Sequence, residues 1–148
     1  MDFIYKDINS ELAYQYLKKN LLPNIEEYTK AKCFGCYFNN QLIAVSRVVT
    51  GTTRKENIDL IKNANIHINL EDIAYLAGIF INENFRGLGI SKELVNLRLK
   101  YISNLNFIKL IVTDIRETNP INYNFKEIGR FKNPLNPKIN MICLISFK

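Results

Sequence analysis

One short segment decides how this chain folds: Phe85-Arg86-Gly87-Leu88-Gly89-Ile90-Ser91. The apolar run Asp72–Ile81 precedes it and is typical of a central strand buried on both faces. The segment that follows, Ile90–Asn104, has helical spacing, because Ile90, Leu94, Leu97 and Tyr101 fall on one stripe that Val95 and Ile102 widen. A second apolar run, Phe107–Ile115, has β character, so strand, helix and strand follow one another. This order favours a right-handed crossover and parallel pairing of the two strands.

The rest of the chain supplies short elements on both sides of this unit. An Asn39-Asn40 pair tolerates positive φ and predicts a tight hairpin. Asn9 or Ser10 offers an N-cap for a first helix. The other expected elements are strand 2–8, helix Glu11–Asn20, a short helix or turn from Pro23 to Tyr28, strands Lys32–Phe38 and Gln41–Val49, helices Glu56–Lys62 and Asn119–Glu127 with Gly129 as a C-cap, and strands Gly129–Lys132 and Ile139–Phe147. Residues 1–148 therefore read as a single α/β domain with a mixed sheet.

Composition narrows the class of protein. The hydrophobic fraction of 47% and the charged fraction of 23% are ordinary for a globular protein. The net charge of +6 attracts anions, which include nucleic acid, acidic lipids and phosphorylated cofactors. No nucleic-acid-binding motif accompanies the charge, and we expect no nucleic-acid partner. We also expect a soluble, cytoplasmic protein without a membrane partner, because no signal peptide is recognisable and no apolar run approaches the roughly 20 residues of a membrane span.

Three cysteines, Cys33, Cys36 and Cys143, argue against a disulfide framework because their number is odd. Cys33 and Cys36 have a C-x-x-C spacing, but they lie in a predicted strand, where positions three apart point to opposite faces. We therefore expect small buried side chains and no metal site.

The glycine-containing loop at Arg86–Ser91 has the chemistry of an anion site. Glycine lets the backbone approach a ligand closely. The first N–H groups of the following helix lack partners within the helix, and the helix dipole favours an anion there. A dinucleotide-binding G-x-G-x-x-G would need glycine at position 92, where Lys92 stands, and the P-loop pattern is absent. The alternative is a plain strand-to-helix turn.

The loop resembles the [QR]-x-x-G-x-[GA] signature of the GNAT superfamily of N-acetyltransferases. Arg86 takes the first position, Gly89 the glycine, and Ser91 the last, where a small residue departs from Gly or Ala. Upstream, Leu76–Asn84 looks like the fourth strand of that family, and Asn119–Phe131 is similar to its second CoA segment. The resemblance spans about residues 31–132. It implies a mixed, mostly antiparallel central sheet of about six to seven strands, with flanking helices and parallel, splayed strands four and five.

The resemblance also implies acetyl-CoA as co-substrate, with no metal. The pyrophosphate is expected over six loop residues, the pantetheine arm is expected along the end of the fourth strand, and one further side chain is expected to help hold the cofactor. The residues expected at the pyrophosphate are Arg86, Gly87, Leu88, Gly89, Ile90 and Ser91. Those expected along the pantetheine arm are Ile79, Phe80 and Ile81, and the further side chain is Asn119. The backbone N–H near Ile79 or Ile81 would face the thioester oxygen.

The reaction implied is direct attack of a primary amine on the acetyl thioester. Glu71 and Asp72 are the preferred candidates for a general base over His67, and the alternative is that both acids are a solvated strand entry. Many relatives place a tyrosine where this chain has Phe125. Tyr123 is a candidate substitute for that acid; it can equally be a structural surface tyrosine, or no acid is needed.

Two further points stay open. A regulatory module that binds acetyl-CoA without turnover is the alternative function, because Phe125 cannot donate a proton and no base is obvious. The acceptor cannot be read from the sequence, although Gly51–Asn69 is expected to border its site. Homodimers are frequent in the family, so a homodimer is a possible assembly.

Overall fold

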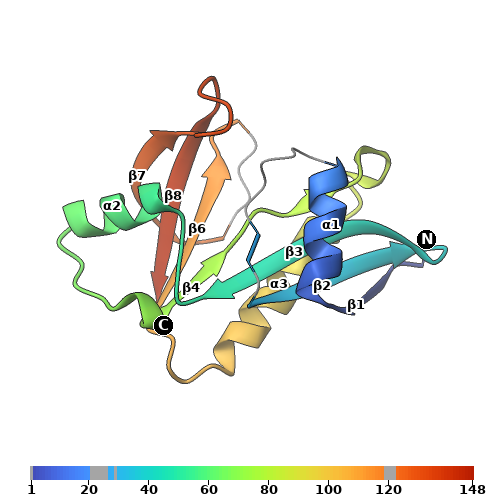
Figure 1. The fold of residues 1–148 in the computed structure, drawn as a ribbon, viewed down its shortest axis with the longest axis horizontal. Coiled ribbons are helices and arrows are strands. Elements are labelled where there is room, and N and C mark those ends of the chain that lie inside the picture. The colour runs from blue at the N-terminus through green and yellow to red at the C-terminus, as the bar shows by residue number, and fades with distance from the viewer. Residues whose placement is uncertain (1, 21–26, 29, 119–122) are drawn as a thin grey trace. The chain divides into compact units, whose positions relative to one another are not determined.

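The computed structural model describes residues 2–20, 27–28, 30–118 and 123–148. Within it the chain forms two compact units (Figure 1). The first unit combines Met1–Val49 with Ala77–Leu105, and the second combines Thr50–Leu76 with Asn106–Lys148. The chain therefore passes from one unit to the other after Val49, Leu76 and Leu105. That residues 1–148 act as one domain stays a prediction.

The strands of the first unit are all antiparallel to their neighbours. They are β1 (Ile4–Ile8), β2 (Ala31–Phe38), β3 (Gln41–Thr50) and β5 (Phe80–Ile81). β2 pairs with β1 on one side and β3 on the other, and β3 also pairs with β5. The predicted hairpin is confirmed, because Asn39 and Asn40 connect β2 to β3 with φ values of 49° and 63°.

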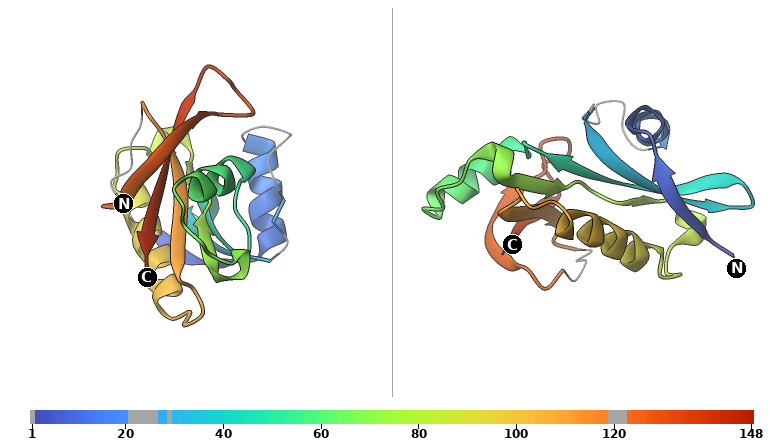
Figure 2. Two further views of the ribbon diagram at one scale, coloured as in Figure 1. Left: turned by 90° about the vertical axis from the view of Figure 1, so that its left-hand side faces the viewer. Right: turned by 90° about the horizontal axis from the view of Figure 1, so that it is seen from below.

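Two helices, α1 (Ser10–Asn20) and α3 (Ile90–Ser103), cover opposite faces of these strands (Figure 2). The N-cap prediction for α1 is confirmed, because Asn9 Oδ1 accepts the Leu12 N–H at 2.7 Å. Cys33 packs with Leu17 of α1, whereas Cys36 packs in the cluster that contains Leu94 of α3. The two cysteines thus point to opposite faces, as the strand period predicts. Burial raises the pKa of the Cys33 thiol to about 11.

The second unit contains the parallel strand pair. Its elements are α2 (Lys55–Asn63), the 3-10 turn η1 (Leu70–Asp72), β4 (Ile73–Leu76), β6 (Leu110–Arg116), β7 (Lys126–Lys132) and β8 (Asn140–Phe147). β4 runs parallel to β6, as predicted, and β8 pairs antiparallel with both β6 and β7. The parallel register ends at Leu76 opposite Thr113, although β6 continues to Arg116.

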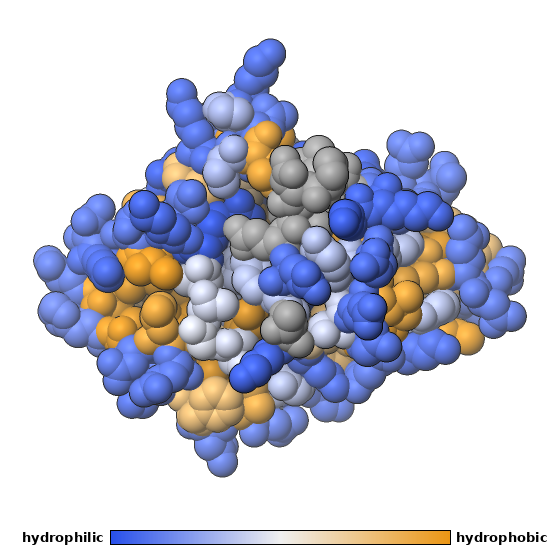
Figure 3. Space-filling model, in the orientation of Figure 1, coloured by the Kyte–Doolittle hydropathy of each residue, from blue (hydrophilic) through white to orange (hydrophobic). Residues whose placement is uncertain are grey.

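The core of the second unit forms where α2 packs on these strands. Ile61 of α2 lies in one cluster with Val112 of β6 and Ile145 of β8. Leu60 and Ile66 are only partly buried against this cluster. Figure 3 accordingly shows apolar side chains at the surface beside α2.

Three local predictions are wrong. The run Asp72–Ile81 is not one strand, because β4 ends at Leu76 and the extended chain resumes as β5, paired with β3. A helix over Asn119–Glu127 is not formed at its described end: Lys126 begins β7 and pairs with Ile145, and Gly129 lies within that strand instead of capping a helix. Pairing with a distant strand outweighs the local helix signal in this segment. Residues 119–122, and residues 21–26 of the expected Pro23–Tyr28 helix or turn, lie outside the described residues.

The predicted helix Ile90–Asn104 is confirmed as α3. Its buried face contains Ile90, Leu94, Val95 and Ile102 as expected, but it also contains Arg98, which is completely buried. The predicted fold class is confirmed: a mixed α/β, mostly antiparallel architecture with one parallel pair. The described residues form eight strands, more than predicted, because the expected central strand is divided into β4 and β5.

Candidate functional site

The candidate site is the loop that connects β5 to α3 in the first unit. The Asn82 N–H donates to the Ile43 carbonyl of β3 at 2.8 Å, and the Asn82 carbonyl accepts the Phe85 N–H at 2.9 Å. Asn82 Oδ1 also accepts the Asn84 N–H at 3.0 Å. The turn η2 (Glu83–Phe85) is therefore fixed to the edge of β3 before the glycine segment begins.

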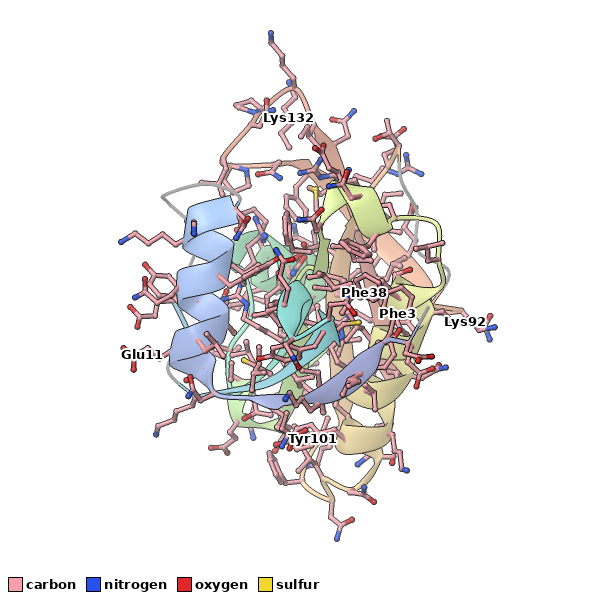
Figure 4. The ribbon with its side chains drawn as sticks, turned by 90° about the vertical axis from the view of Figure 1, so that its right-hand side faces the viewer. Phe3, Glu11, Phe38, Lys92, Tyr101 and Lys132 are labelled. Carbon is pink, nitrogen blue, oxygen red and sulfur yellow. The ribbon has the colours of Figure 1, made fainter. Side chains whose placement is uncertain are left out.

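Contacts between aromatic rings hold the same turn against the first unit. The Phe85 ring lies 5.3 Å from the Phe38 ring and 6.3 Å from the Phe3 ring, measured between centroids. Phe3 and Phe38 contact each other at 5.7 Å and lie together in Figure 4. The loop thus starts from a packed aromatic base, while the next four residues, 86–89, are exposed.

Arg86 and the two glycines shape the exposed part of the loop. Arg86 Nε donates to the Ile81 carbonyl at 3.2 Å, which turns the side chain back toward β5. Gly87 and Gly89 have φ values of 77° and 83°, a region that favours glycine. A Cβ added at either position would meet no atom within 4 Å, so the space above this backbone is open.

The loop ends at the N-terminus of α3. Gly89 is the N-cap residue and has no side chain to cap the helix, and its carbonyl accepts the Glu93 N–H at 3.3 Å. The N–H groups of Ile90, Ser91 and Lys92 therefore precede the first carbonyl available within the helix, and they carry the positive end of its dipole. Lys92 projects outward at this end of α3 (Figure 4). The predicted residues Arg86–Ser91 thus form one continuous, electropositive turn.

The backbone of β5 alternates between two sides. Because the Asn82 N–H donates to Ile43 on β3, the neighbouring Ile81 directs its N–H and carbonyl groups away from β3. The Ile81 carbonyl accordingly accepts from Arg86. Phe80 directs its backbone groups toward Val45 of β3. Of the three residues predicted to contact the pantetheine arm, Ile81 therefore directs its backbone groups away from β3 and Phe80 does not, while Ile79 lies before β5.

The predicted acid–base residues lie in the second unit. Glu71 is exposed in η1, immediately before β4. Asp72 Oδ2 lies 3.4 Å from Lys109 Nζ, and the Asp72 carbonyl accepts the Lys109 N–H at 2.8 Å. His67 is exposed. Glu71 and Asp72 therefore lie at the beginning of β4, at the opposite end of this strand from Leu76.

Tyr123 lies in an irregular segment and not in a helix. Its side chain is buried, and its ring centroid is 5.3 Å from that of Phe125, which is partly buried. Asn124 between them has a φ of 58°. Tyr123 is therefore not the surface tyrosine of the alternative interpretation. Asn119 lies outside the described residues.

The sequence interpretation missed a buried polar cluster in the second unit. Asp114 Oδ2 accepts hydrogen bonds from the Tyr75 hydroxyl and from Asn57 Nδ2, both at 2.8 Å. Arg54 Nε lies 3.4 Å from the same oxygen. Burial raises the pKa of Tyr75 well above its usual value, and the charge of Asp114 adds to this effect. Arg54 and Asn57 lie together at the start of α2, but Tyr75 and Asp114 come from distant segments, so no local pattern points to the group.

Comparison with known families decides the class of protein. The model of the family described as "Acetyltransferase (GNAT) family" matches residues 1–129 of this chain. The chain belongs to the GNAT family. The resemblance of the sequence to this family is thereby confirmed.

Solved structures show the same GNAT fold. An acetyltransferase of the GNAT family from Streptococcus pneumoniae has a TM-score of 0.69 at 9% identity, covering 99% of each chain. NAA60 from Arabidopsis thaliana in complex with acetyl-CoA has a TM-score of 0.64 at 14% identity, covering 99% of this chain and 98% of that one. An IAA acetyltransferase from Bacillus cereus has a TM-score of 0.67 at 12% identity, covering 99% of this chain and 100% of that one. No curated protein matches this sequence.

Two further features of this GNAT chain concern metals and membranes. Across the described residues, no three His, Cys, Asp or Glu side chains are grouped closely enough to hold a metal ion. In the same part of the chain, no helix is both long enough and apolar enough to span a membrane.

Proposed function

We propose that this GNAT protein transfers an acetyl group from acetyl-CoA to a primary amine by direct attack. The observation that carries the proposal is the open glycine turn at the N-terminus of α3, between Arg86 and Ser91. The complex of the similar NAA60 with acetyl-CoA supports the choice of cofactor, and the NAA60 complex with a bisubstrate analogue supports a two-substrate reaction.

In this proposal the turn holds the pyrophosphate of acetyl-CoA. The N–H groups from Gly87 to Ser91 donate to its oxygens, and the positive charges of Arg86 and Lys92 add attraction at the rim. Each charge-assisted hydrogen bond is worth about 1.5–3 kcal/mol. Gly87 and Gly89 adopt positive φ without the steric strain that other residues would have, so the backbone can take this shape and approach the ligand closely.

The pantetheine arm follows the side of β5 that faces away from β3. The backbone N–H of Ile81 is suited to pair with its amides, because it is not directed to β3, and we propose that Ile79 pairs with them as well. Phe80 then contributes packing instead of hydrogen bonds, since its side chain lies in the cluster with Leu17 of α1. We propose that Asn119 also helps to hold the cofactor.

The chemistry begins with a neutral amine. A lysine-type amine with a pKa near 10.4 is about 0.1% neutral at pH 7, so deprotonation costs about 4–5 kcal/mol. The amine nitrogen then attacks the carbonyl carbon, the carbon–sulfur bond breaks, and the departing thiolate takes a proton. We propose Glu71 or Asp72 as the base, acting through water, and Tyr123 as the acid.

A catalytically silent acetyl-CoA-binding module is the second candidate function. Phe125 favours it, because this partly buried ring stands where many relatives have a tyrosine and has no proton to donate. In that case the loop would bind acetyl-CoA as a signal, and the amine site would not be used.

Thermal unfolding with acetyl-CoA tests the cofactor assignment. At about 100 times Kd, a ligand stabilises the folded state by about 2.7 kcal/mol. For a domain of this size, that raises Tm by roughly 5–11 °C. No shift at millimolar acetyl-CoA would refute the cofactor assignment.

Release of free CoA thiol in the presence of an amine panel separates the two functions. The panel should contain polyamines, amino acids, aminoglycosides and peptides with free α-amines or lysines. Thiol release that depends on one class of amine supports the transferase. A Tm shift without thiol release for any amine favours the silent module. Glu71→Gln and Asp72→Asn then test the base: whichever acts as base should lose about 10²–10⁴-fold in kcat.

A further inference from the structure

The completely buried Arg98 of α3 binds main-chain carbonyls of the first unit. Its Nη1 donates to the Ala77 carbonyl at 2.6 Å and to the Arg47 carbonyl at 3.3 Å. The Ala77 N–H donates to the same Arg47 carbonyl at 3.2 Å. Burying a guanidinium is costly unless it is hydrogen-bonded, and arginine stays charged at all accessible pH values. These carbonyl contacts offset that cost and join three chain segments at one point.

The residue that Arg98 holds is the first after β4. β4 ends at Leu76, and the chain resumes as β5 only at Phe80, so Ala77–Ile79 is a break in the extended backbone. Ala77 is held on both sides, because its N–H is bound by Arg47 and its carbonyl by Arg98. The break therefore has a defined conformation.

Fixing the Ala77 carbonyl also fixes the N–H of Gly78. In a trans peptide the carbonyl and the following N–H point in opposite directions, and no cis peptide is found in the described residues. The Gly78 N–H is thus directed away from Arg98. Gly78 is exposed, and a Cβ built there would meet no atom within 4 Å. A ligand can therefore approach this backbone closely.

We propose that Arg98 is a positioning residue for acyl transfer, which sets the Ala77–Gly78 peptide so that the Gly78 N–H donates to the thioester oxygen. This inference rests on the proposed function. When the amine nitrogen bonds to the carbonyl carbon, the π electron pair moves to oxygen, and the Gly78 N–H stabilises that charge. The pair returns when the carbon–sulfur bond breaks and the thiolate leaves. A donor fixed in advance stabilises the transition state without reorganisation.

The same helix links this donor to the phosphate turn. α3 begins at Ile90 beside the proposed pyrophosphate site, and Arg98 lies eight residues farther along, about 12 Å at the α-helical rise. One rigid helix thus orients both the anionic end of the cofactor and the peptide that faces its reactive carbonyl.

Arg98→Met tests the role, because methionine fills similar space without donors or charge. We expect kcat to fall about 100-fold, the loss typical of a misplaced or removed donor. Kd for CoA, which lacks the acyl group, should stay within about twofold, because it reports on the phosphate turn. Arg98→Lys keeps one charged donor and should recover part of kcat. Lys100→Met removes a charge from the exposed side of α3 and should leave kcat unchanged.

A wild-type kcat in folded Arg98→Met would overturn the proposal. So would equal losses of kcat and CoA affinity in both Arg98 variants, because that pattern indicates a merely structural role. Failure of the wild-type protein to release thiol would instead refute the proposed function.

The NMR resonance of the Gly78 amide separates failure of the positioning role from failure of the proposed function. The chain has six glycines, so ¹⁵N-glycine labelling gives few resonances, and Gly78→Ala assigns the one in question. Without any ligand, Arg98→Met should move the Gly78 amide resonance and leave that of Gly129 in place. An unmoved Gly78 resonance would overturn the positioning role whether or not the protein is active.

Discussion

Replacing Asp114 with asparagine should destabilise the second unit through its buried polar cluster. The Asp114 side chain is 3% exposed, and one of its oxygens accepts from both Tyr75 and Asn57 while facing Arg54. Asp114→Asn removes the negative charge but keeps the volume. The change therefore isolates the electrostatic part of the cluster.

The expected loss is about 3 kcal/mol. Removing one partner of a buried ion pair costs about 3–5 kcal/mol. The lower end applies here, because the Arg54 side chain is 19% exposed and partly screened by water, and because asparagine can keep one acceptor for Tyr75 or Asn57. For a domain of this size, 3 kcal/mol corresponds to a fall in Tm of roughly 6–12 °C.

Urea unfolding followed by circular dichroism measures this loss. Asp59→Asn is the matched control, because Asp59 is exposed on α2 and should change stability by less than about 0.5 kcal/mol. Tyr75→Phe should cost about 1–2 kcal/mol, since it removes one hydrogen bond to a charged acceptor. The double variant should lose less than the sum, because both changes remove the same contact. A loss below about 1 kcal/mol for Asp114→Asn, or strict additivity, would refute this reasoning.

Three other outcomes are expected. Gly89→Ala should lower the free energy of unfolding by about 1–2 kcal/mol, because alanine is strained at a φ of 83°. The same change should weaken acetyl-CoA binding in titration calorimetry. Gly51→Ala, at a φ of 85°, should show the loss of stability without the loss of affinity. Gly129→Ala should cost about 1–3 kcal/mol in urea unfolding, because its Cβ would come within 2.5 Å of the Leu60 Cδ2, and a Leu60→Ala background that does not lessen this cost would contradict the clash. Burial raises the pKa of the Cys143 thiol from 9.0 to about 12, so between these pH values the folded state keeps the proton that the unfolded state loses. The stability that depends on this proton is complete below pH 9 and is lost as the pH rises to about 12. The free energy of unfolding of Cys143→Ala should therefore fall less steeply over this range than that of the wild type.

Local patterns predicted the parts of the fold that depend on neighbouring residues. The Asn39-Asn40 turn needs only two residues that tolerate positive φ, and the N-cap at Asn9 needs only its own side chain. The Arg86–Ser91 turn is similarly local, since glycine conformation and the start of a helix create it. For this reason the sequence identified the candidate cofactor loop as well as the family.

Predictions failed where a distant partner decides the conformation. The local sign of a break in the apolar run 72–81 is a single glycine, Gly78, and pairing decides the break, because β5 pairs with β3 and β4 with β6. Residues 126–127 carry helical character locally, but β8 supplies a strand partner. Backbone hydrogen bonds to another strand outweigh propensities of a few tenths of a kcal/mol per residue.

By itself, the sequence determined the order of the main elements, the hairpin and the glycine turn at the N-terminus of α3. Only the tertiary structure decided that Arg98 is buried against the Ala77 carbonyl, and that Asp114 gathers Tyr75, Asn57 and Arg54 around one oxygen. The physical reason is that a charged side chain can be buried at low cost only where hydrogen-bonding or oppositely charged groups surround it. Those groups come from segments far apart in the chain.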